Sequence, residues 1–167
     1  MREPYSATAL ASLSWGVGER PIDRVAAAGR CDPLGILIWR ARYMQESKAY
    51  EEALQSLLTA FRARYGAEAA DVAARVVAQG FNEFLFPFCS QCLGAKEAVI
   101  EKLKVVCPTC QGLGLKRFSD FERARSMQLS YGLTKRLAHK IRWVYDKAAA
   151  LDALVNVQMG EQLERPR

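Results

Sequence analysis

The sequence predicts a mainly α-helical protein with a small zinc-binding β-hairpin inserted near its middle and a helix-turn-helix-like pair of helices at its C-terminal end. Apolar residues recur at helical spacing on both sides of residues 89–110, and that segment holds four of the five cysteines of the 167-residue chain. We divide the chain into an N-terminal helical region (1–86), a zinc-binding module (87–117) and C-terminal helices (118–167). The C-terminal helices are expected to form one compact body with the N-terminal ones.

The first helices are expected before residue 45. A loosely packed helix is expected around residues 7–15, and a short one over PIDRVAAAG, residues 21–29. Asp32 followed by Pro33 is typical of an N-cap and a first helical residue. The helix that they open has an apolar face made of Leu34, Leu37, Ile38 and Ala41.

Two longer amphipathic helices follow. Ser47 is the predicted cap of the first and Gly66 its stop; its apolar stripe is Tyr50, Leu54, Leu57, Phe61 and Tyr65. The second is expected over residues 67–84, ending before Pro87, and its inner face is Ala73, Val76, Val77, Phe81 and Phe84. We interpret both stripes as hydrophobic core.

The four clustered cysteines form two CxxC pairs, Cys89/Cys92 and Cys107/Cys110, with fourteen residues between the pairs. Such spacing suits a metal site, disulfides or redox chemistry. The chain has no signal-peptide pattern and no run near the roughly 18 apolar residues of a membrane span, so we expect a reducing cytoplasm. Neither pair sits at the strand-to-helix junction of a thioredoxin-like site, which leaves metal binding as the favoured chemistry.

The expected metal is one structural zinc ion per chain, bound by Cys89, Cys92, Cys107 and Cys110. Two short antiparallel strands in AKEAVIEKLKVV would bring the two pairs together. Four thiolates leave no coordination position open for water, and the chain has a single histidine, so we expect no enzymatic activity. Cys31 lies far from the quartet in the sequence.

The C-terminal region is expected to form two consecutive helices. Ser119 is the predicted cap of SDFERARSMQ, the pattern breaks around Gly132, and Thr134 is predicted to open a long helix. The apolar seam of that helix is Leu137, Ile141, Val144, Ala148, Leu151 and Val155. Two helices joined by a short glycine-containing turn have the outline of a helix-turn-helix.

Positive charge is concentrated in one part of the chain. Residues 1–95 contain ten Lys/Arg and ten Asp/Glu, residues 96–147 contain twelve against five, and residues 148–167 contain two against three. A surface that neutralises phosphates needs such concentration, which favours nucleic-acid binding. The predicted DNA-binding residues are Lys116, Arg117, Arg123 and Arg125 for flanking phosphates, and Lys135, Arg136, His139, Lys140 and Arg142 for groove and backbone.

Three segments resemble a known family. CSQC…CPTCQGLG, KRFSDFERARSMQ and LTKRLAHKIRWVYDKAAALDALV are similar to the Q antitermination proteins of lambdoid bacteriophages, in the branch that carries a cysteine zinc finger. The resemblance is best over about residues 85–155, and Lys96 departs from it where a complete CxGxG knuckle has a second glycine. The cysteine-rich region of Hsp40 chaperones is also similar, but its four repeats and its J-domain are missing from this sequence.

The resemblance implies a transcription regulator of the bacterial host cytoplasm. Such a protein binds double-stranded DNA at the phage late promoter, engages RNA polymerase paused with its sigma factor, and promotes readthrough of terminators. We expect the polymerase contact on the N-terminal helices, with Trp15, Trp39 and Tyr43 as candidates; the favoured alternative for each of them singly is a place in the hydrophobic core. The alternatives are a conventional DNA-binding repressor and a zinc-stabilised adaptor whose basic face meets an acidic protein.

Overall fold

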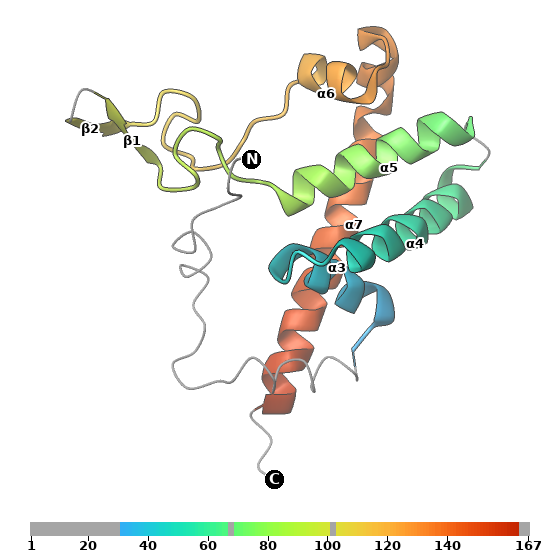
Figure 1. Ribbon diagram of the computed structural model, residues 1–167. Coiled ribbons are helices and arrows are strands. Elements are labelled where there is room, and N and C mark those ends of the chain that lie inside the picture. Colours follow the sequence, from blue (N-terminus) through green and yellow to red (C-terminus); the bar gives the residue numbers. More distant parts are fainter. Residues whose placement is uncertain (1–30, 67–68, 101–102, 164–167) are drawn as a thin grey trace. The chain divides into compact units, whose positions relative to one another are not determined.

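The computed structural model describes residues 31–66, 69–100 and 103–163, and the helices expected at 7–15 and 21–29 lie outside them. The described chain forms two units. The helical unit comprises α3 (Pro33–Tyr43), α4 (Ser47–Tyr65), α5 (Ala70–Leu85), α6 (Asp120–Met127) and α7 (Tyr131–Leu163). The cysteine unit, residues 86–118, contains β1 (Glu97–Ile100) and β2 (Leu103–Val106) (Figure 1). The predicted mainly helical fold with a small hairpin is therefore confirmed.

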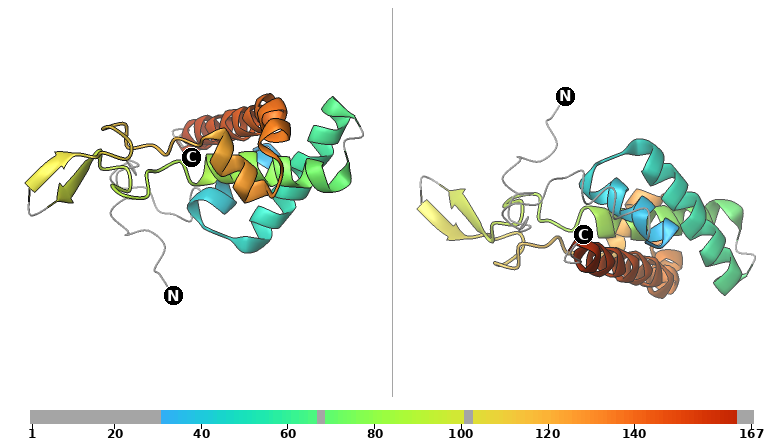
Figure 2. Two further views of the ribbon diagram at one scale, coloured as in Figure 1. Left: turned by 90° about the horizontal axis from the view of Figure 1, so that it is seen from above. Right: turned by 90° about the horizontal axis from the view of Figure 1, so that it is seen from below.

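The core of the helical unit is centred on α5 and α7. In both views of Figure 2, α3 and α4 lie on one side of α7. Fully buried side chains come from four helices and include Ile38, Leu57, Phe61, Val76, Val77, Phe81, Ile141 and Val144. Gly80 lets α5 approach α7 closely, because a Cβ atom there would lie 2.6 Å from the carbonyl oxygen of Ile141. All five residues predicted on the inner face of α5 are buried.

The start of α3 agrees with the sequence, whereas the start of α4 does not. Asp32 Oδ1 accepts a hydrogen bond from the N–H of Gly35 at 2.8 Å, and Pro33 is the first helical residue. The N-cap of α4 is Glu46, and the predicted cap Ser47 is already helical. The Glu46 carboxylate makes no cap bond, because it pairs with Arg40 at 2.6 Å.

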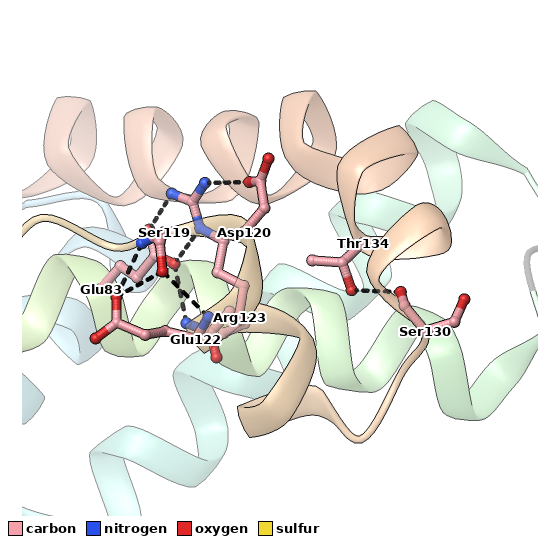
Figure 3. Close-up of polar contacts among 8 residues, drawn as sticks. Glu83, Ser119, Asp120, Glu122, Arg123, Ser130 and Thr134 are labelled. Atoms are coloured by element: carbon pink, nitrogen blue, oxygen red, sulfur yellow. Dashed lines mark hydrogen bonds and ion pairs between the residues drawn. The ribbon is translucent and has the colours of Figure 1, made fainter.

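The helix α6 begins with a capping box (Figure 3). Ser119 Oγ accepts from the N–H of Glu122 at 3.2 Å, and the Glu122 carboxylate accepts from the N–H of Ser119 at 2.9 Å. Gln128, in a left-handed conformation, ends the helix. The predicted cap and extent of this helix are therefore confirmed.

The last helix, α7, begins about one turn earlier than predicted. It starts at Tyr131, so Gly132 and Thr134 lie inside it. Ser130 Oγ accepts from the N–H of Leu133 at 3.3 Å, and the buried Thr134 hydroxyl donates to the Ser130 carbonyl at 3.1 Å (Figure 3). Ser130 therefore caps the helix, and Thr134 is a buried residue of its first turns.

The cysteine unit is built on a two-stranded antiparallel sheet, as predicted. Glu97 pairs with Val106 and Ile100 with Leu103. The segments that enter and leave the unit also lie side by side, through a bridge between Phe88 and Leu115. No helix within the described residues is long and apolar enough to cross a membrane.

Candidate metal centre and nucleic-acid interface

The structure brings the four predicted cysteines together in one buried cluster. The Sγ atoms of Cys89, Cys92, Cys107 and Cys110 all lie within 4.8 Å of one another. The Cys89–Cys107 and Cys92–Cys110 Sγ distances are 3.8 and 3.6 Å, too long for a disulfide. Sulfurs bound tetrahedrally at about 2.3 Å from an ion are about 3.8 Å apart, so the quartet fits a four-coordinate metal site.

The two cysteine pairs belong to two similar turns, which we call the first knuckle (89–96) and the second knuckle (107–114). Positive φ angles occur at the same three positions after the second cysteine of each: Leu93, Gly94 and Lys96 in the first, and Gln111, Gly112 and Gly114 in the second. Lys96 therefore adopts the backbone conformation that the sequence led us to expect only of a glycine. The shape of the first knuckle is preserved despite the missing glycine.

Reciprocal backbone hydrogen bonds join the knuckles. The N–H of Cys89 donates to the carbonyl of Gly114, and the N–H of Cys107 donates to the carbonyl of Lys96, both at 2.9 Å. The last residue of each knuckle therefore accepts a hydrogen bond from the first cysteine of the other knuckle. This exchange fixes the spacing of the two pairs without help from a large core.

The thiols are in unequal environments. Burial opposes ionisation of Cys110, but the N–H of Gly114, 3.2 Å from its Sγ, and the neighbouring thiols lower its pKa to about 7. The N–H of Cys110 favours the Cys107 thiolate, but burial and the thiols of Cys110 and Cys89 raise the pKa of Cys107 to about 11. A cation that binds all four sulfurs as thiolates must therefore displace protons.

Two polar residues that the sequence analysis missed support the centre. Gln91 Oε1 accepts a short hydrogen bond from the Thr109 hydroxyl and lies 3.7 Å from Cys107 Sγ. Gln91 and Thr109 each directly precede the second cysteine of their pair, in CSQC and CPTC. Two polar residues at equivalent positions of the two pairs are the sequence feature from which their contact could have been predicted. Cys31 is outside the quartet and packs beside Trp39 and Val155.

The predicted DNA-binding residues have different surroundings. Seven are exposed: Lys116, Arg117, Arg125, Lys135, Arg136, His139 and Arg142. Lys140 is half-buried, and Arg142 pairs with Asp146 at 2.8 Å. The exposed cations of α7 thus remain candidates for phosphate contact.

Arg123 is a structural residue of the helical unit. Its Nε and Nη2 atoms donate to the two carboxylate oxygens of Glu83, each at 2.7 Å (Figure 3). The Glu83 side chain is only 5% exposed and also accepts from Gln79. Hydrogen bonding to Glu83 raises the pKa of Arg123. This pairing joins α6 to α5, and we remove Arg123 from the candidate phosphate contacts.

The candidates for polymerase contact differ in their surroundings. Trp39 is 4% exposed and packs against Val155 and Met159, so it is a core residue. Tyr43 is half-buried and its hydroxyl donates to Asp152 at 3.2 Å. Trp15 lies outside the described residues.

Comparison with protein-family models, curated proteins and solved structures found no match to this chain. Its function is therefore inferred from the cysteine centre and from the placement of its charges.

Proposed function

We propose that this chain is a zinc-stabilised, duplex-DNA-binding transcription factor that acts in antitermination. The observation that carries the proposal is the concentration of positive charge in residues 96–147, twelve Lys/Arg against five Asp/Glu, with most of the candidate side chains exposed. The resemblance of the cysteine and C-terminal segments to lambdoid Q proteins supplies the step from DNA binding to antitermination.

The role of the metal follows from its ligands. Zinc suits four thiolates at tetrahedral spacing, and a closed shell has no position for a substrate or water. The cysteine unit has little other core, since β2 is exposed throughout, so the ion supplies folding free energy to this unit. No covalent chemistry is proposed.

DNA binding is assigned mainly to the first half of α7. Lys135, Arg136 and His139 are exposed there, and α6 directly precedes this helix and contacts it. In a helix-turn-helix, the second helix lies in the major groove and its early residues contact bases. Arg125 of α6 supplies a further phosphate contact in this arrangement.

A transcription assay tests the proposal. With purified bacterial RNA polymerase and sigma factor, the protein should increase full-length RNA from a template that carries a lambdoid late promoter upstream of an intrinsic terminator. Deletion of the promoter-proximal DNA should abolish the effect. Repression of initiation without readthrough would indicate a conventional repressor, and polymerase binding without duplex binding would indicate an adaptor.

A further inference from the structure

The last turn of α4 and one side of α7 share a cluster of aromatic rings and cations. The rings of Tyr65 and Trp143 are 5.6 Å apart and nearly perpendicular, at 89°. The Arg64 guanidinium lies 5.6 Å from both ring centroids. Lys140 Nζ lies 5.0 Å from the Tyr65 ring, and Lys147 Nζ lies 5.9 Å from the Trp143 ring. We call these five residues, together with Arg136, the aromatic–basic surface.

The cations of this surface form a row. Arg136, Lys140 and Lys147 are separated by four and seven residues, so they share one side of α7 and span about 16 Å at about 1.5 Å per residue. Within the described part of the chain, no carboxylate forms an ion pair with Arg64, Arg136 or Lys147. On the neighbouring side of α7, by contrast, Arg142 is paired with Asp146.

We propose that the aromatic–basic surface binds the sugar-phosphate backbone of duplex DNA, and that Arg64 of α4 is part of it. This inference rests on the proposed function and adds a contact from the N-terminal helices. Tyr65 and Trp143 are half-buried against the core, so their rings hold the cations and do not stack on bases. A cation held over a ring loses less side-chain entropy when it meets a phosphate.

The chemistry of the surface favours phosphate over an acidic protein. Protein interfaces usually have an apolar centre. Among the described residues of α4 and of 136–147, no large apolar side chain is strongly exposed. A DNA strand offers a regular row of anions, one about every 3.4 Å of helix axis, which a row of cations can meet together. Its contacts beyond Arg136, which also belongs to the groove-facing start of α7, are to phosphates, so they position the protein without reading sequence.

The test compares two double variants of the full-length protein. Binding to a fluorescent random-sequence duplex is measured by anisotropy between about 50 and about 200 mM salt. Arg64→Ala/Lys147→Ala should lower the salt slope by about two, so that this fourfold salt increase weakens the wild type about tenfold more than the variant. The matched control is Lys48→Ala/Arg62→Ala, which removes two exposed cations of α4 outside the surface and should keep a slope closer to that of the wild type.

Trp143 provides a second test, as a positioning residue. Trp143→Leu should lower duplex affinity severalfold without changing the salt slope, because the charges remain but are no longer held, and Trp143→Phe should restore affinity. Circular dichroism checks that each variant is folded.

The outcomes separate this inference from the proposed function. Wild-type protein that binds no duplex would overturn both. If the wild type binds and Arg64→Ala/Lys147→Ala matches it in affinity and slope, this inference alone fails. It also fails if that variant keeps duplex binding but loses binding to RNA polymerase, which would indicate an acidic protein partner.

Discussion

Lys96 and Gly114 occupy equivalent positions in the two cysteine knuckles, with φ angles of 68° and 76°. A left-handed conformation costs a residue with a Cβ atom about 1 to 2 kcal/mol, partly offset by the greater freedom of glycine in the unfolded chain. Lys96→Gly should therefore stabilise the metal-loaded protein by about 0.5 kcal/mol in urea unfolding. A loss of stability would show that the lysine side chain contributes more than its backbone conformation costs.

Gly114 should not tolerate the reverse change. A Cβ atom there would lie 2.8 Å from the carbonyl oxygen of Gly94, and its φ is already unfavourable for other residues. Gly114→Ala should destabilise the cysteine unit and weaken metal retention against a chelator. Unchanged retention would contradict the tight packing of the two knuckles.

Metal content should depend on the quartet alone. Elemental analysis should find one zinc per chain in the wild type and in Cys31→Ser, and much less in Cys107→Ser. Retention of a full equivalent by Cys107→Ser would contradict four-thiolate binding.

Metal affinity should fall as the pH is lowered. Cys107, with a pKa of about 11, carries a proton throughout the neutral range that the ion must displace, so each pH unit should cost about tenfold in apparent affinity from this thiol alone. Below the pKa of about 7 of Cys110 the proton on that thiol also competes with the ion, and the dependence should steepen. Chelator competition between about pH 8 and about pH 6 measures this slope, and a pH-independent affinity would contradict it.

The Arg123–Glu83 pair should matter for stability. Arg123→Met leaves the buried Glu83 carboxylate without its cation and should cost about 3 kcal/mol in unfolding free energy. Adding Glu83→Gln should recover part of this loss. As a control, Arg142→Ala removes an exposed pair and should cost less than about 1 kcal/mol.

The sequence predicted features whose signals are local. Each of these features depends on residues within a few helical turns or within one hairpin. They are the Asp32–Pro33 helix start, the apolar stripe of α5 and the spacing of the cysteines. The errors arose where a distant partner decides the outcome. Arg123 looked like a surface cation because Glu83 lies forty residues earlier. Trp39 kept contact as an alternative to core because its partners Val155 and Met159 lie more than a hundred residues later.

The cysteine unit begins and ends at adjoining points of the chain. The N–H of Lys116 donates to the carbonyl of Pro87 at 2.7 Å, so the chain leaves this unit beside the point where it entered. An insertion with adjoining ends fits wherever the two host segments that carry it come close together, as at a turn between two helices. The unit can therefore form its hairpin and its metal site while the helices that flank it keep their own packing.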